Sequence, residues 1–158
     1  MMPKTRSVIT AILALCAIVS GPKARAEENS SARHVGGSWI TDASPSATVS
    51  LTTFTQEGAV VSSRPPVVLT PAGAEFVSTG HGTWTQSADK EIASTVLYLR
   101  SSLNAEFTGI TKVVMSLKPM EKPDELRGTA TVEIFLANGS LLVSFPIPIK
   151  MTRIPVEH

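Results

Sequence analysis

The stretch VGGSWITDA, from Val35 to Ala43, decides how this chain folds. It opens the first segment in which apolar and polar residues alternate, and it contains Trp39, which precedes every other large aromatic residue. A glycine at position 37 stands two residues before this indole. We expect Trp39 to fill one end of a small β-barrel, because the remainder of the chain has the pattern of short strands.

The first 26 residues have the pattern of a secretory signal peptide. Lys4 and Arg6 make the start basic, and Val8 to Ser20 is an apolar run without acidic residues. Ala24 to Ala26 then provides the small-x-small site that signal peptidase requires. We therefore expect cleavage before Glu27 and a secreted or periplasmic mature protein.

Two other interpretations of this segment are weaker. A membrane-spanning helix needs about 20 apolar residues and this run is shorter, so no membrane insertion is expected after cleavage. Lipid on Cys16 would tether the protein, but Leu15 is larger than the residue that usually precedes a lipid-bearing cysteine. Cys16 is the only cysteine, so the exported domain would have no disulfide and must rely on one hydrophobic core.

Charge and composition exclude several classes of partner. Four of the 14 Lys and Arg lie before the cleavage site, so 10 remain against 13 Asp and Glu, a formal charge of −3. No basic patch remains, which argues against nucleic acid. The three histidines, His34, His81 and His158, lie far apart in the chain, so no metal site and no cofactor are expected.

From Gly36 onward, β-branched residues alternate with polar ones and turn residues recur at regular intervals, which predicts an all-β fold. Residues 27–35 are expected to form a flexible leader, and residues 36–158 one barrel domain. Asn138-Gly139 is the strongest hairpin signal, because it accepts positive φ at both central positions of a turn. The expected strands are 36–42, 47–55, 58–64, 81–86, 91–100, 106–118, 125–136 and 141–154. Eight strands joined in sequence predict a single antiparallel up-and-down β-barrel, whose closure leaves no exposed edge.

Side-chain alternation shows the interior face of the last two strands. One face of each strand is apolar and is expected to point inward: Leu126, Gly128, Ala130, Val132, Ile134 and Leu136, and then Leu141, Val143, Phe145, Ile147, Ile149 and Met151. The phase of residues 91–100 stays open, because both of its faces are apolar. Pro146 and Pro148 have no N–H to donate to a β-ladder. Because residues two apart direct their backbone N–H groups at the same neighbouring strand, we expect the missing hydrogen bonds, a seam in the barrel, only beside the first strand.

In an eight-stranded meander the chain begins and ends at the same end of the barrel. Trp39 and Arg153 are therefore expected to meet there, with Gly37 leaving room between them. Stacking a guanidinium on an indole, with bonds to nearby carbonyls, satisfies a buried arginine. We expect these three residues to form a structural plug.

Gly37-Ser38-Trp39 together with Thr152-Arg153-Ile154 resembles the calycin signature of lipocalins and related small barrels. Over about residues 36–154, further segments resemble a bacterial family of lipocalin-like proteins: FTQEG at 54–58, GHGTW at 80–84 and GTATVEI at 128–134. The Thr-Asp-Tyr motif of the lipocalins is absent between the sixth and seventh expected strands. The resemblance thus implies the barrel, and it does not imply transport of a particular ligand.

If one end is plugged, the mouth lies at the other end, among the loops 42–46, 64–80, 101–105 and 137–140. The loop 64–80 is the longest, with apolar residues at Val67, Val68, Leu69 and Phe76. Long loops in compact domains tend to be functional, so we expect a lid over the mouth. The alternative is that this loop merely covers a sheet edge.

The expected function is binding of a small apolar molecule inside the barrel. The residues expected to contact it are Phe76, His81, Tyr98, Val132, Ile134, Phe145 and Ile147. One alternative is a cofactor-free barrel enzyme of the cyclase, isomerase or hydratase type, with His81, Tyr98 or Glu106 inside as acid–base candidates. A structural barrel filled by its own side chains is the other. Arg100 and Glu106 are expected to form a surface ion pair across a hairpin.

Overall fold

The computed structural model describes residues 35–43, 48–70 and 73–157. The expected signal peptide with its cleavage site, and residues 27–34 of the expected leader, lie outside the described residues. The described elements are all strands of one antiparallel sheet. Their bounds are β1 Gly37–Ala43, β2 Thr48–Phe54, β3 Ala59–Ser63, β4 Val67–Thr70, β5 Gly73–Val77, β6 Gly80–Gln86, β7 Ile92–Ser102, β8 Phe107–Pro119, β9 Glu125–Leu136 and β10 Leu141–Arg153.

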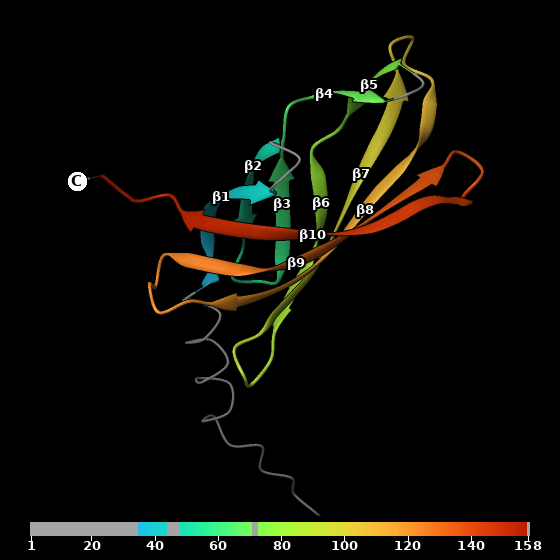
Figure 1. Ribbon diagram of the computed structural model, residues 1–158. Helices are drawn as coiled ribbons and strands as arrows, with labels where there is room; N and C mark the ends of the chain where they lie inside the picture. The colour runs from blue at the N-terminus through green and yellow to red at the C-terminus, as the bar shows by residue number, and fades with distance from the viewer. Residues whose placement is uncertain (1–34, 44–47, 71–72, 158) are drawn as a thin grey trace, which may run out of the picture.

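Eight of the ten strands close into a barrel (Figure 1). Their order around it is β1-β2-β3-β6-β7-β8-β9-β10, and β10 pairs back with β1. Leaving β4 and β5 aside, each strand therefore pairs with its neighbour in sequence. The predicted all-β up-and-down barrel is confirmed, and the strand bounds differ from the expected ones by only a few residues.

The segment 64–80 is a hairpin of β4 and β5, so the expectation of a loop there is wrong. β6 pairs with β7 only as far as His81 opposite Leu97. Beyond that point β5 takes its place, with Phe76 opposite Ser101 and Val77 opposite Arg100. The upper end of β7 would otherwise present unpaired backbone groups, which β5 satisfies. The hairpin therefore extends the barrel wall at the mouth (Figure 1).

The predicted plug is confirmed. The Arg153 Cζ lies 4.3 Å from the centroid of the Trp39 ring, and its Nη1 donates to the Gly36 carbonyl at 2.8 Å. Its Nε lies 3.4 Å from Oδ1 of Asp124. Trp39 is wholly buried and donates from Nε1 to the Val35 carbonyl at 3.0 Å. The guanidinium thus ties the first and last strands to the β8–β9 turn.

Glycine is required beside this stack. Gly37 has φ of +126°, and a Cβ there would lie 2.8 Å from Nη1 of Arg153. Val35, which the sequence places in the leader, is 1% exposed. It packs with the core, and its carbonyl accepts a hydrogen bond from the indole N–H of Trp39.

Large side chains fill the half of the barrel next to the plug. The Phe54 and Trp84 rings meet edge to face with their centroids 5.5 Å apart, and Trp84 donates from Nε1 to the Thr55 carbonyl. The other large side chains that are fully buried are Trp39, Ile92, Leu117, Leu126 and Met151. The core therefore lies mainly at the closed end.

The structure resolves the phase of β7. Ile92, Val96 and Tyr98 are buried, whereas Leu97 and Leu99 are 45% and 57% exposed. On β9 and β10 the expected inner face is buried towards the plug. Towards the 137–140 turn it is exposed, because β10 there extends beyond its pairing with β1, whereas β9 stays paired with β8 as far as Leu136 (Figure 1).

The predicted seam is also present. Within the described residues β1 pairs with β10 only from Trp39 opposite Arg153 to Asp42 opposite Lys150. Pro146 and Pro148 lie beyond these pairs and face β9 across their ladder. The prolines therefore lie beyond the part of β10 that the described residues of β1 pair with.

The 137–140 hairpin is confirmed, but its turn differs from the expected one. Only Gly139 has positive φ, at +83°. Asn138 instead accepts from the backbone N–H of Ser140 through its Oδ1 at 3.0 Å. A hydrogen bond from the asparagine side chain thus stabilises the turn, in place of the positive φ that was expected at this residue.

Arg153→Ala should lower the free energy of unfolding by roughly 2–4 kcal/mol, because it removes the stack on Trp39 and opens the plug. Chemical denaturation of purified protein measures this. Arg127→Ala is the matched control, since Arg127 is 57% exposed in a surface ion pair, where truncation changes stability by at most about 1 kcal/mol. Equal losses in both variants would contradict the structural role of the plug.

Candidate functional site

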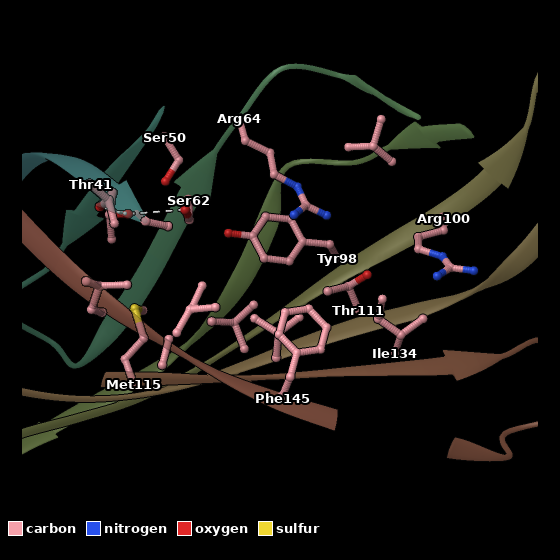
Figure 2. Close-up of a pocket in the computed structure, with 18 of the residues that line it drawn as sticks. Thr41, Ser50, Ser62, Arg64, Tyr98, Arg100, Thr111, Met115, Ile134 and Phe145 are labelled. Carbon is pink, nitrogen blue, oxygen red and sulfur yellow. Dashed lines mark hydrogen bonds between the residues drawn. The ribbon is translucent and has the colours of Figure 1, made fainter. Parts of the chain in front are cut away.

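A cavity of about 280 Å³ occupies the half of the barrel opposite the plug (Figure 2). It lies among the barrel strands and the β4–β5 hairpin. Its lining residues are Thr41, Ala43, Ser50, Thr52, Ser62, Arg64, Val68, Leu69, Thr70, Glu75, Tyr98, Arg100, Thr111, Val113, Met115, Ala130, Val132, Ile134, Phe145, Ile147 and Ile149. The barrel interior is therefore filled at one end and open at the other.

One wall of the cavity is apolar and comes from β8, β9 and β10. Ala130, Val132 and Ile134 reach it from β9, and Phe145 and Ile147 from β10. These residues have the inward phase that the sequence predicts. The small side chain of Ala130 leaves space that a larger residue would fill.

The opposite wall, from β1, β2 and β3, carries hydroxyl groups. Thr41 Oγ1 bonds Thr52 Oγ1 at 2.9 Å, and Thr52 Oγ1 bonds Ser62 Oγ at 3.1 Å. On β2 the apolar residues face outward, with Val49 and Leu51 53% and 52% exposed. The cavity therefore has one apolar wall, which the sequence predicts, and one polar wall, which it does not.

Tyr98 lies in the cavity between these walls (Figure 2). It is 5% exposed, and its ring passes over Gly80, where a Cβ would lie 2.5 Å from Cε1 of Tyr98. Burial raises the pKa of its phenol above 10.0, against the opposing effects of a Ser62 hydrogen bond and the Arg64 charge. The phenol is therefore neutral at physiological pH.

Arg64 reaches into the cavity from the end of β3 and covers the Tyr98 ring (Figure 2). Its Cζ lies 4.4 Å from the ring centroid. Burial lowers the pKa of this guanidinium, and the charge of Arg100 acts in the same direction. Among the described residues Arg64 forms no ion pair, and its buried Nε has no hydrogen-bond partner.

Arg100 pairs with Glu75, so the expected surface pair with Glu106 is wrong. Nε of Arg100 lies 3.3 Å from Oε2 of Glu75, and the two residues are only 8% and 9% exposed. β5 brings Glu75 to this position because Val77 pairs with Arg100 across the ladder. Glu106 is exposed and lies just before β8, outside the cavity.

Two of the expected ligand contacts face away from the cavity. His81 is exposed because Trp84 is buried, and alternation along β6 then turns Gly80 and Gly82 inward and His81 outward. Phe76 is 42% exposed because it alternates with buried Glu75. The other five expected contacts, Tyr98, Val132, Ile134, Phe145 and Ile147, all line the cavity.

The sequence analysis missed Arg64, Glu75 and the hydroxyl wall, and it assigned Arg100 to a surface ion pair. The inward hydroxyls of β2 could have been predicted from Phe54, because residues two and four positions before a buried aromatic residue share its face of the strand. Within residues 35–43, 48–70 and 73–157, no cluster of His, Cys, Asp or Glu could hold a metal ion. The same residues contain no helix long and apolar enough to cross a membrane.

Comparison with known proteins adds no relative: no protein-family model, curated protein or solved structure matches this chain. The fold and the cavity therefore rest on the residues themselves. They define an eight-stranded antiparallel barrel that is plugged at one end and hollow at the other.

The phenol of Tyr98 should lose its proton above the ordinary value of 10.0, because the folded state keeps it away from water. Tyr98 is the only tyrosine, so an ultraviolet absorbance titration reports on it alone. In the unfolded chain the proton leaves near pH 10, so this contribution to stability is present below pH 10 and is lost as the pH rises towards the folded pKa. Titration at or below 10.0 in folded protein would contradict the buried position.

Proposed function

We propose that this protein is an exported β-barrel that binds a small, mainly apolar molecule in its interior. The observation that carries the proposal is the cavity of about 280 Å³, with its apolar wall from β8, β9 and β10. Ligand sites are typically concave, largely apolar and furnished with a few polar groups. This cavity has each of these features.

The cavity volume indicates the size of the ligand. If each non-hydrogen atom occupies about the volume of a water molecule, ~30 Å³, a space of about 280 Å³ holds roughly nine of them. Covering about 300 Å² of hydrocarbon at roughly 25 cal/mol per Å² provides about 7 kcal/mol before the costs of association. Affinities between micromolar and millimolar follow from these magnitudes.

The enzyme alternative has less support. It requires His81, Tyr98 or Glu106 to converge inside the barrel, and of these residues only Tyr98 lines the cavity. The raised pKa of that phenol keeps it protonated at neutral pH, so it cannot accept a proton there as a general base. The filled structural barrel is also less favoured, because the half of the barrel away from the plug holds the cavity.

We also propose that the chain is a calycin-type protein. The support is a closed antiparallel barrel of eight strands together with the Gly37, Trp39 and Arg153 plug at the joined ends. Export rests on the signal-peptide pattern of residues 1–26. A chain exported in this way would meet its ligand outside the cytoplasm.

1-Octanol, with nine non-hydrogen atoms, should bind the purified mature protein, because its hydrocarbon fits beside the apolar wall. Calorimetric titration or ligand-observed NMR measures the binding. Ile134→Trp should abolish it by filling the cavity. Leu97→Trp is the matched control, since Leu97 is 45% exposed on the outer face of β7, and it should leave binding unchanged. Absence of octanol binding to the folded wild type would contradict the proposal.

Secreted protein should begin at Glu27, because signal peptidase cleaves after Ala24 to Ala26. Intact-mass spectrometry of protein from the culture medium or periplasm measures this. A diacylglycerol mass on Cys16 would instead identify a membrane-tethered lipoprotein.

A further inference from the structure

We infer that the ligand carries one negative charge, a carboxylate at one end of its apolar body, and that Arg64 binds this carboxylate. The inference rests on the proposed function and specifies the class of molecule that the cavity accepts. It follows from the charges that line the cavity and from the way those charges are paired.

Among the described residues, three charged side chains line the cavity: Arg64, Arg100 and Glu75. Arg100 and Glu75 neutralise each other across 3.3 Å in a nearly dry environment. Arg64 remains, with an aromatic face as its neighbour and without an ion pair among the described residues. The cavity therefore carries one uncompensated positive charge.

Partial burial of this charge carries a desolvation penalty, which a ligand of opposite charge would offset. Burial lowers the pKa of Arg64, and its Nε is out of contact with water and has no hydrogen-bond partner. A guanidinium remains charged in proteins, so it cannot relieve the penalty by losing its proton. A bound carboxylate would offset the penalty, because its two oxygens match the fork of guanidinium N–H donors in a bidentate pair.

The position of Arg64 also fixes the orientation of the ligand. Figure 2 shows its guanidinium above the Tyr98 ring, with Phe145, Ile134 and Met115 across the cavity. A carboxylate at Arg64 leaves the rest of the molecule against these apolar side chains. Tyr98 holds the guanidinium in place by stacking and remains neutral, so it does not repel the anion.

The number of charges distinguishes a carboxylate from other headgroups. A phosphate dianion would need a second free cation, and Arg100 is already occupied by Glu75. A cationic ligand would be repelled by Arg64, and a neutral ligand would leave Arg64 uncompensated. A monocarboxylate matches the single positive charge.

The test compares octanoate, 1-octanol and octylamine by calorimetric titration at neutral pH. Hydrogen bonds to a charged group change affinity by roughly 10- to 100-fold. Octanoate should therefore bind the wild type at least 10-fold more tightly than octanol, and octylamine should bind most weakly. Arg64→Met should remove the octanoate advantage, so that the ratio of octanoate to octanol affinity falls to about one, because it keeps the apolar stem and loses the charge.

Two further variants complete the test. Arg127→Met is the matched control, since Arg127 is 57% exposed outside the cavity, and it should keep the full preference. Arg64→Lys keeps the charge without the fork, so an intermediate preference is expected. It also provides the measurement if thermal unfolding shows that Arg64→Met does not fold.

The outcomes separate the two proposals. If octanol binds and octanoate binds no more tightly, the carboxylate inference is wrong and the binding function stands. If the preference survives in folded Arg64→Met, another group recognises the carboxylate and Arg64 does not. If none of the three compounds binds the folded wild type, both proposals fail.

Discussion

A short contact between the first and last strands controls the rest of this structure. Among the described residues β1 pairs with β10 at four positions, from Trp39 opposite Arg153 to Asp42 opposite Lys150. The guanidinium of Arg153 fastens this contact by stacking on the indole and bonding the Gly36 carbonyl. Because the closure is fixed at one end, the opposite end can stay open without the barrel unrolling. Beyond these pairs, the prolines of β10 make further pairing with β1 unfavourable.

The distribution of side-chain size follows the same division. Trp39, Phe54 and Trp84 fill the closed half, whereas Ala130 and hydroxyl residues border the cavity. Along β2 the usual arrangement is inverted, with apolar residues exposed and hydroxyls inside. Stability therefore comes mainly from the plugged half, and the proposed ligand contacts lie in the open half. The charge of Arg64, which has no ion pair within residues 35–43, 48–70 and 73–157, is tolerable because the other half of the barrel supplies the stability.

The sequence predicts those features that depend on local alternation. It predicts the strands and the inward faces of β9 and β10 from alternation of period two. It also predicts the plug, because an arginine on the inward face of a strand needs a stacking partner. Features that depend on distant partners were missed. Glu75 meets Arg100 only because β5 replaces β6 beside β7. The expectation that His81 lies inside the barrel rests on its acid–base chemistry alone. Alternation along β6 from the buried Trp84 turns its side chain outward.

The central claim is that the open half of the barrel holds a small molecule against its apolar wall. Nuclear Overhauser effects between bound 1-octanol and methyl-labelled protein test it most directly. The structure predicts transfer to Val132, Ile134 and Ile147, which line the cavity. Transfer confined to the outward methyls of Val49 or Leu97, with none from the interior, would contradict it.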